Sequence, residues 1–281
     1  MLRSQLPPRR GHAFVLPEMK TLYVSTPKAA CTTLKWIFAE LGGEDLARLG
    51  PPAGKSHGSR IHHRGQWQRV PAPHDLSDEE LADIDPANGW HVFAVVRHPA
   101  SRLWSSWQQK VLLGTPAILE KTPRHLIPDP PASSADIRAA FRAFALGLAA
   151  GECDALLDDP HFTPQQRLLR PRRVPFSRIY TMDEMDSVLA DLGERARQHG
   201  LGALPTPGSH NSTPLKPLRS VFTPEVCAAV DEVYGADRRL WFAASDPVPR
   251  AGTDPDWPDE QIALVRRAMG RESRSRFTAD G

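Results

Sequence analysis

A short segment near the start of the chain places one cation and two hydroxyl groups at a predicted turn. In LYVSTPKAACTTLKWIFAEL, residues 22–41, an apolar run ends before Pro27, and Lys28 precedes Thr32 and Thr33 by about one helical turn. From Thr32 the apolar residues follow helical spacing, which predicts that a helix begins there. The N terminus of a helix exposes backbone N–H groups and the positive end of its dipole, so this turn could bind a phosphate or sulfate group.

The same residues also fit an ordinary strand-to-helix turn with an exposed lysine, and both interpretations stay open for this segment alone. A nucleotide-binding P-loop requires the pattern G-x-x-x-x-G-K-[ST]. No glycine lies between Gly11 and Gly42, so a P-loop of the Walker type is excluded.

A second predicted strand ends in an arginine. The continuous apolar run WHVFAVV, residues 90–96, is typical of a buried strand, and Arg97 follows it directly. Ligands of open α/β sheets bind at the carboxyl ends of the strands, where Arg97 would offer a forked grip on a phosphate. Pro99 suits a first helical turn, and Ser105 lies about two turns after Arg97. Alone, the pair of Arg97 and Ser105 favours a salt bridge of the arginine at the strand end over a phosphate site.

These residues are positioned by strands that alternate with helices, which predicts a central parallel sheet flanked by helices in three layers. The predicted strands are residues 22–25, 90–96 and 178–182. The predicted helices are residues 32–41, 99–113, 134–150, 183–197 with Asp183 as its cap, and 223–241. We expect loops over residues 114–133 and 200–217. The expected organisation is an N-terminal arm (1–19), one domain (20–250), and a C-terminal helix with a frayed tail (251–281).

The composition is that of a soluble globular protein. The 281 residues include 35 basic and 33 acidic side chains, and the resulting charge of +2 is too small for a nucleic-acid coat. The three cysteines are odd in number and irregularly spaced, which argues against a disulfide framework or a zinc cluster. No segment approaches about 18 consecutive apolar residues, and the first residues lack the apolar core of a secretory signal. We therefore expect a cytoplasmic protein without a transmembrane segment.

The two segments TPKAACTTLK and VVRHPASRLWSSW, in this order, resemble the two donor-binding motifs of sulfotransferases. The resemblance is closest to the carbohydrate branch with the chondroitin and dermatan enzymes, in a soluble form of bacterial type. It continues in family order through DPHFTPQQ, RIYTMDEMDSVLADLG, HNSTP and VDEVYGADRRLWF, and covers most of residues 20–243. It implies a P-loop-like sulfotransferase fold and 3′-phosphoadenosine 5′-phosphosulfate (PAPS) as the sulfuryl donor.

The resemblance also implies roles for individual residues. Lys28 would contact the oxygen that bridges phosphate and sulfuryl group, and Arg97 and Ser105 would bind the 3′-phosphate. The 5′-phosphate would be held by the backbone amides of Ala29, Ala30, Cys31, Thr32 and Thr33, with the threonine hydroxyls. Sulfuryl transfer needs positioning and charge stabilisation, which one lysine and a helix terminus can supply, so we expect no metal.

The acceptor hydroxyl must lose a proton, and a histidine suits this task near neutral pH. Related glycosaminoglycan sulfotransferases place a catalytic histidine between the first helix and the second strand, where this chain has SRIHHRGQW. His62 and His63 are therefore candidates, and His62 is favoured because it follows the apolar Ile61. His161 in DPHFTPQQ is the competitor. The pair also fits a solvated loop.

The sequence thus predicts a PAPS-dependent sulfotransferase that modifies a hydroxyl of a sugar or glycan. A nucleotide-dependent small-molecule kinase is one alternative, although the glycines of a P-loop are missing. A nucleotide-binding module of the same fold without catalysis is the other. The basic run Arg167, Arg170, Arg172 and Arg173 could meet an anionic acceptor, or it could be a solvated surface. The acceptor and the oligomeric state are not fixed by the sequence.

Overall fold

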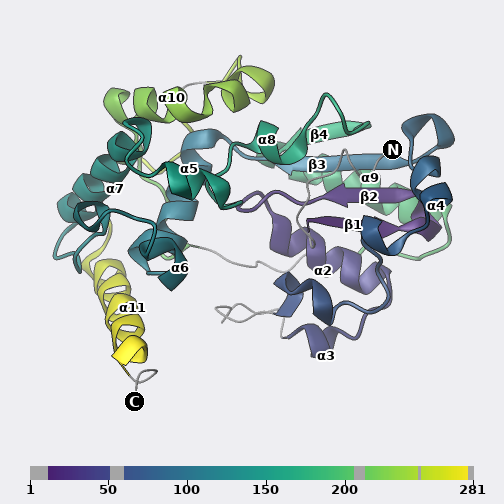
Figure 1. The fold of residues 1–281 in the computed structure, drawn as a ribbon, viewed down its shortest axis with the longest axis horizontal. Helices are drawn as coiled ribbons and strands as arrows, with labels where there is room; N and C mark the ends of the chain where they lie inside the picture. Colours follow the sequence, from purple (N-terminus) through teal and green to yellow (C-terminus); the bar gives the residue numbers. More distant parts are fainter. Residues whose placement is uncertain (1–11, 51–59, 206–212, 246–247, 278–281) are drawn as a thin grey trace. The chain divides into compact units, whose positions relative to one another are not determined.

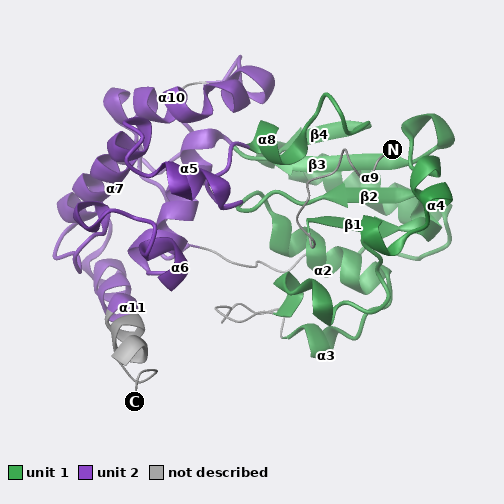
Figure 2. Cartoon of the chain, in the orientation of Figure 1, with its two compact units in different colours: residues 1–97, 165–212 green, residues 98–164, 213–281 purple. Residues whose placement is uncertain are grey.

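The computed structural model describes residues 12–50, 60–205, 213–245 and 248–277. The chain forms two compact units (Figure 2): unit 1 comprises residues 1–97 and 165–212, and unit 2 comprises residues 98–164 and 213–281. The segment HNSTP, which begins at His210, lies mostly outside the described residues.

Unit 1 is built on a four-stranded sheet with the order β1–β2–β3–β4 (Figure 1). The strands are β1 (Ala13–Leu16), β2 (Thr21–Val24), β3 (His91–Val96) and β4 (Arg178–Thr181). Strands β2, β3 and β4 are parallel, and β1 is antiparallel to β2. The prediction of a mixed α/β fold with a mostly parallel sheet is confirmed.

Strand β1 corrects the prediction of an arm over residues 1–19. All four of its residues are buried, and its register with β2 runs from Ala13 opposite Val24 to Leu16 opposite Thr21. The hairpin closes through Lys20, which is left-handed (φ 45°) and donates its backbone N–H to the carbonyl of Pro17 at 2.9 Å. The strand was not predicted because its apolar run is only four residues long and lies between Pro- and Arg-rich segments.

Two helices pack on one face of this sheet. The sheet contributes Tyr23 from β2, Phe93 from β3 and Tyr180 from β4, all fully buried, with the ring centroids of Tyr23 and Phe93 5.1 Å apart. Helix α2 (Cys31–Leu41) and helix α9 (Met185–Gln198) complete this core with Leu34, Ile37, Phe38, Val188 and Leu192. The helical spacing predicted from Thr32 onward is confirmed, and α2 ends at Gly42, as predicted.

The start of α9 differs from the prediction. Asp183 was expected to be its cap, but a 3-10 turn (Met182–Glu184) precedes the helix. Thr181 and Glu184 form a capping box there, in which the Glu184 carboxylate accepts the backbone N–H of Thr181 at 2.7 Å. The T-x-x-E spacing of Thr181 and Glu184 therefore determines where the helical segment begins, because it satisfies two backbone N–H groups at once.

Unit 1 also contains α3 (Leu46–Leu49), α4 (Asp78–Asp83) and α8 (Gln165–Leu169). The described residues between α3 and α4 include the short 3-10 turns η2 (Arg60–His62), η3 (Arg64–Gln66) and η4 (Pro73–Asp75).

Unit 2 is helical in its described residues. Its helices are α5 (Pro99–Trp107), α6 (Pro116–Leu119), α7 (Ser134–Ala149), α10 (Pro224–Trp241) and α11 (Asp259–Phe277). Trp104 stacks on Trp257 with ring centroids 5.6 Å apart, and Phe141 meets Trp104 edge-on.

Two predictions about unit 2 need correction. The predicted loop at 114–133 contains α6, because Pro116 fits the first turn of a helix. Helix α11 extends to Phe277, beyond Arg271, where we expected the tail to fray. No described helix is long and apolar enough to cross a lipid bilayer.

Candidate functional site

The turn between β2 and α2 has an unusual backbone. Lys28 (φ 69°) and Ala30 (φ 54°) both adopt the left-handed conformation, which is uncommon for residues other than glycine. Ala30 is the N-cap of α2, and its side chain has no oxygen that could accept a first-turn N–H group. An anion at this position would complete the hydrogen bonding of the helix N terminus. Thr32 is buried on the first turn, and Thr33 is partly exposed.

Arg97 links the two predicted motifs within unit 1. Because β2 and β3 are parallel neighbours, their carboxyl ends lie at the same edge of the sheet. The Arg97 Nη1 atom donates to the carbonyl oxygen of Lys28 at 3.2 Å. The side-chain amide of Gln165, which is fully buried, accepts the backbone N–H of Arg97 and donates to its carbonyl, both at 2.9 Å. The arginine is therefore fixed from its backbone and from its side chain.

His62 contacts helix α2 through both ring nitrogens. Its Nε2 atom lies 3.3 Å from the Thr32 hydroxyl, and its Nδ1 atom lies 3.3 Å from the Lys35 ammonium nitrogen. Both His62 and His63 are exposed, and His63 precedes the next 3-10 turn, η3. The structure therefore brings His62 to the predicted anion site.

The segment that carries His62 is anchored in the core of unit 1. Ile61 is fully buried, and its carbonyl accepts the indole N–H of Trp67 at 3.1 Å. Glu44 is only 8% exposed, and its carboxylate accepts backbone N–H groups of the three residues that follow Trp67, at 2.7–3.0 Å. These donors are Gln68, Arg69 and Val70. A buried carboxylate with several backbone donors fixes the segment firmly.

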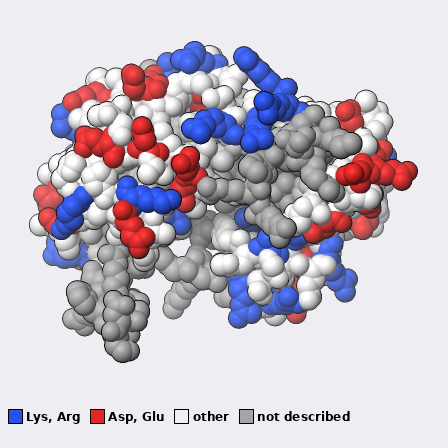
Figure 3. Space-filling view, viewed as in Figure 1, with Lys and Arg blue, Asp and Glu red and all other residues white. Residues whose placement is uncertain are grey.

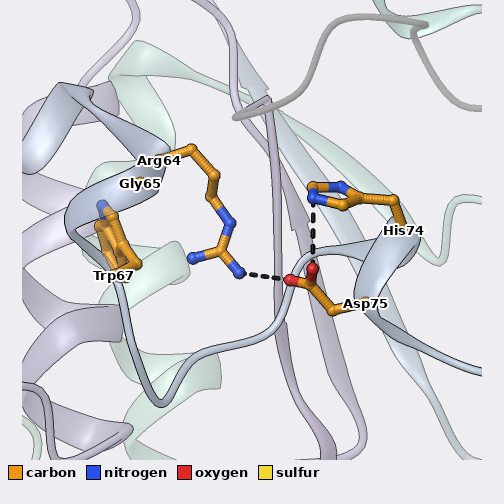
Figure 4. Close-up of a pocket in the computed structure, with 5 residues that line it drawn as sticks. All are labelled: Arg64, Gly65, Trp67, His74 and Asp75. Atoms are coloured by element: carbon orange, nitrogen blue, oxygen red, sulfur yellow. Dashed lines mark hydrogen bonds and ion pairs between the residues drawn. The ribbon is translucent and has the colours of Figure 1, made fainter.

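The same segment forms one wall of a pocket of about 430 Å³ (Figure 4). Its lining residues are Arg64, Gly65, Trp67, His74 and Asp75. Asp75 accepts a hydrogen bond from Arg64 at 2.8 Å and lies 3.2 Å from the His74 ring. Burial alone would raise the pKa of Asp75, but the Ala72 N–H, Arg64 and His74 together hold it below its usual value. This ion cluster ties η3 to η4.

Two further predicted site residues, Ser105 and His161, lie in unit 2. Ser105 is on α5 and is 4% exposed. The Nδ1 atom of His161 lies 2.8 Å from the Asp159 carboxylate, which also accepts the His161 backbone N–H at 2.9 Å. Burial by itself would raise the pKa of Asp159, but the bonds and charge of His161 outweigh it and lower the pKa to about 2. The Ser106 hydroxyl donates to the His161 carbonyl, which ties this turn to α5.

The predicted basic run surrounds the C-terminal end of α8. Arg172 and Arg173 are exposed, and Arg170 has a left-handed backbone (φ 51°). Lysine and arginine side chains gather over the region of α8 in Figure 3.

The comparison with protein families agrees with this geometry. A family model described as "Sulfotransferase family" matches residues 11–240, well over half of the chain. The chain belongs to the sulfotransferase family. This is a family of enzymes that use PAPS as the sulfuryl donor. Comparisons of this sulfotransferase with curated proteins and with solved structures gave no match.

The residues of this sulfotransferase fit an anionic donor. The uncapped first turn of α2 offers N–H groups, and Arg97 and Lys28 bring two cationic side chains to the same sheet edge. Three further residues with a role at the site were missed from the sequence: Lys35, Gln165 and Glu44. Gln165 lies in the segment DPHFTPQQ, and Lys35 is the last residue of TPKAACTTLK, so the resemblance to sulfotransferases could have pointed to both. The sequence gives no signal for Glu44.

Proposed function

We propose that this sulfotransferase moves a sulfuryl group from PAPS to a hydroxyl of a carbohydrate or glycoconjugate. The observation that carries the proposal is the contact between Arg97 and the Lys28 carbonyl. It joins the two motifs that bear the resemblance, next to the N terminus of α2. Lys28 and the first turn of α2 bind the 5′-phosphosulfate, and Arg97 binds the 3′-phosphate. The role of Ser105 at the 3′-phosphate is implied by the resemblance alone.

In this mechanism the acceptor oxygen attacks sulfur, and the bond between sulfur and the bridging oxygen breaks in line with the attack. Lys28 stabilises the negative charge that develops on the bridging oxygen as it leaves. The backbone N–H groups of Ala30, Cys31, Thr32 and Thr33 hold the 5′-phosphate in the orientation for transfer. The N–H group of Ala29, expected to do the same, donates to the Thr26 carbonyl at 3.3 Å. A base takes the proton of the acceptor hydroxyl, and the sequence offers His62 and His63 for this role, with His161 as the competitor.

The proposal extends to the acceptor and to the setting of the reaction. A carbohydrate acceptor is supported by the resemblance of TPKAACTTLK and VVRHPASRLWSSW to the carbohydrate branch. The basic side chains near α8 would favour an acceptor that already carries negative charge. We further propose that the enzyme acts in the cytoplasm and that catalysis needs no metal ion.

A transfer assay tests this function directly. The full chain is incubated with PAPS labelled in its sulfate and with a panel of neutral sugars, uronic-acid glycans and phenols, and the products are identified by mass spectrometry. Label in a glycan supports the proposal, whereas label confined to phenols contradicts the carbohydrate part. Calorimetry with 3′-phosphoadenosine 5′-phosphate (PAP) and with ATP is the companion measurement. Tight PAP binding without transfer indicates a binding module, and preference for ATP indicates a kinase.

A further inference from the structure

His62 lies between a cation and a hydroxyl group, and this arrangement determines where its proton resides. Lys35 on α2 is only 6% exposed, and its ammonium nitrogen lies 3.3 Å from Nδ1 of His62. An ammonium group has donors and no acceptor, so Nδ1 must be the accepting nitrogen. The proton of the neutral imidazole is then on Nε2, which lies 3.3 Å from the Thr32 hydroxyl.

Burial disfavours the ammonium form of Lys35, and its neighbours and a bound anion counteract this effect. Burial lowers the pKa of Lys35, and the nearby Cys31 on the same helix opposes this shift. The ammonium lies 5.2 Å from the centre of the Phe14 ring, whose face attracts a cation. Tyr23 lies close to Cys31, and burial raises its pKa, so its phenol stays neutral. A polyanionic donor at the turn before α2 stabilises positive charge on Lys35.

A general base needs the opposite arrangement. The imidazolium that forms is stabilised when Nδ1–H donates to an acceptor, commonly a carboxylate, whereas an ammonium at Nδ1 repels it. We propose that His62 donates a hydrogen bond to the phosphosulfate group of bound PAPS and does not act as the base. Lys35 is the positioning residue that fixes this tautomer of His62. This inference rests on the proposed function. The role of base then falls to His63 or His161.

His161 provides an internal reference for this assignment. Its Nδ1 atom lies 2.8 Å from the Asp159 carboxylate, an acceptor, so neutral His161 has its proton on Nδ1 and none on Nε2. The two histidines should therefore show opposite tautomers in one molecule.

Nitrogen-15 NMR of the imidazole rings tests the tautomer directly. The full chain is labelled at histidine, and the two rings are assigned by the signals lost in His62→Gln and His161→Gln. At neutral pH with saturating PAP, we expect Nε2 of His62 and Nδ1 of His161 to bear the proton. In Lys35→Met the protonation signature of His62 should shift toward a tautomer mixture, and in Lys35→Arg, which keeps a cationic donor, it should remain. A proton on Nδ1 of His62 in the wild-type chain overturns the inference.

PAP affinity and turnover together show whether His62 donates a hydrogen bond or acts as the base. The amide N–H of glutamine can replace an Nε2–H donor, but glutamine cannot accept a proton at neutral pH. We expect His62→Ala to weaken PAP binding about tenfold to hundredfold, the scale of one hydrogen bond to a charged group, and His62→Gln to recover most of that loss. The acidic limb of the pH–rate profile should persist in His62→Gln. Equal loss of turnover in both variants, with normal PAP affinity and no acidic limb, identifies His62 as the base instead.

These measurements remain informative if the proposed function fails. The NMR and PAP-binding arms require no turnover, so a wild-type chain that transfers no sulfate still tests the tautomer and the donor role. Thermal unfolding of each variant identifies any that do not fold. If Lys35→Met unfolds, the wild-type spectrum and the pair of His62 variants still decide the question.

Discussion

The Nη1 atom of Arg97 lies 3.2 Å from the carbonyl oxygen of Lys28, although about 70 residues separate the two in the chain. The contact depends on the parallel pairing of β2 with β3, because only then do both strands deliver their next residue to one edge of the sheet. The left-handed backbone of Lys28 lies at this same contact. Arg97 therefore stabilises the turn that contains Lys28 and adds a positive charge beside it.

Replacing Arg97 by alanine should weaken PAP binding by about 1.5–3 kcal/mol, because a hydrogen bond to a charged phosphate is lost. Adenosine 5′-phosphosulfate, which has no 3′-phosphate, should lose less affinity. Calorimetry with both nucleotides measures the difference, and Arg172→Ala, which removes an exposed arginine, is the control. Equal losses for the two nucleotides would show that Arg97 supports the Lys28 loop without binding the 3′-phosphate.

Replacing Lys28 by alanine should reduce kcat much more than PAP affinity. The lysine charge matters most when the leaving oxygen becomes negative, so its removal raises the barrier more than it weakens the ground-state complex. Single-turnover transfer from labelled PAPS measures the chemical step, and Lys121→Ala, at an exposed site in unit 2, serves as control. Unchanged turnover in Lys28→Ala would remove this residue from the mechanism.

The sequence predicted the elements that carry a strong local pattern. The apolar runs at β2 and β3 and the helical spacing of α2 are set by side chains that must be buried, so the strands, the helix and its end at Gly42 could be read directly. Strand β1 was missed because four apolar residues between proline-rich flanks give too short a signal. Its strand character comes from pairing with β2, which is a tertiary effect.

The candidate site was predictable only in part. Lys28 and Arg97 lie at the ends of recognisable strands, so their positions follow from chain order and parallel pairing. The contacts of Gln165 with Arg97 and of Glu44 with residues 68–70 depend on loop paths that no periodicity encodes. Lys35 lies on a helix with regular spacing, but its burial against Phe14 and His62 became visible only in the folded chain.

Replacing Glu44 by glutamine should loosen the segment that carries His62. The buried carboxylate accepts N–H groups of three residues, and an amide can serve fewer of them and introduces a donor among donors. We expect a loss of about 1–3 kcal/mol in stability, measured by urea unfolding, and faster amide exchange at Gln68 and Val70. Glu40→Gln, an exposed change on α2, is the control. Unaltered exchange at these amides would contradict the anchoring role.

Sulfuryl transfer should persist in EDTA. The proposed site obtains its positive charge from Lys28, Arg97 and the N terminus of α2, and a sulfuryl group carries less charge than a terminal phosphoryl group. Initial rates with labelled PAPS are compared before and after chelation and after addition of magnesium. A loss that magnesium restores would favour a metal-dependent mechanism.

Replacing Asp159 by asparagine should destabilise the protein at neutral pH and have little effect in strong acid. The folded protein lowers the pKa of this carboxyl from 3.8 to about 2, so the folded state binds the proton less readily than the unfolded state. The ionised carboxylate therefore contributes stability above pH 4, and that contribution disappears as the pH falls toward 2. A pKa shift of this size corresponds to about 2 kcal/mol of stability.

Thermal unfolding of the unchanged protein and of Asp159→Asn is measured from pH 7 down to the lowest pH at which both fold. The difference in stability between the two proteins should narrow below pH 4. Asp154→Asn, an exposed substitution in the neighbouring 3-10 turn (Asp154–Asp158), is the control for the loss of a carboxylate in this region. A difference that is constant with pH would mean that Asp159 stabilises its turn by shape and not by charge.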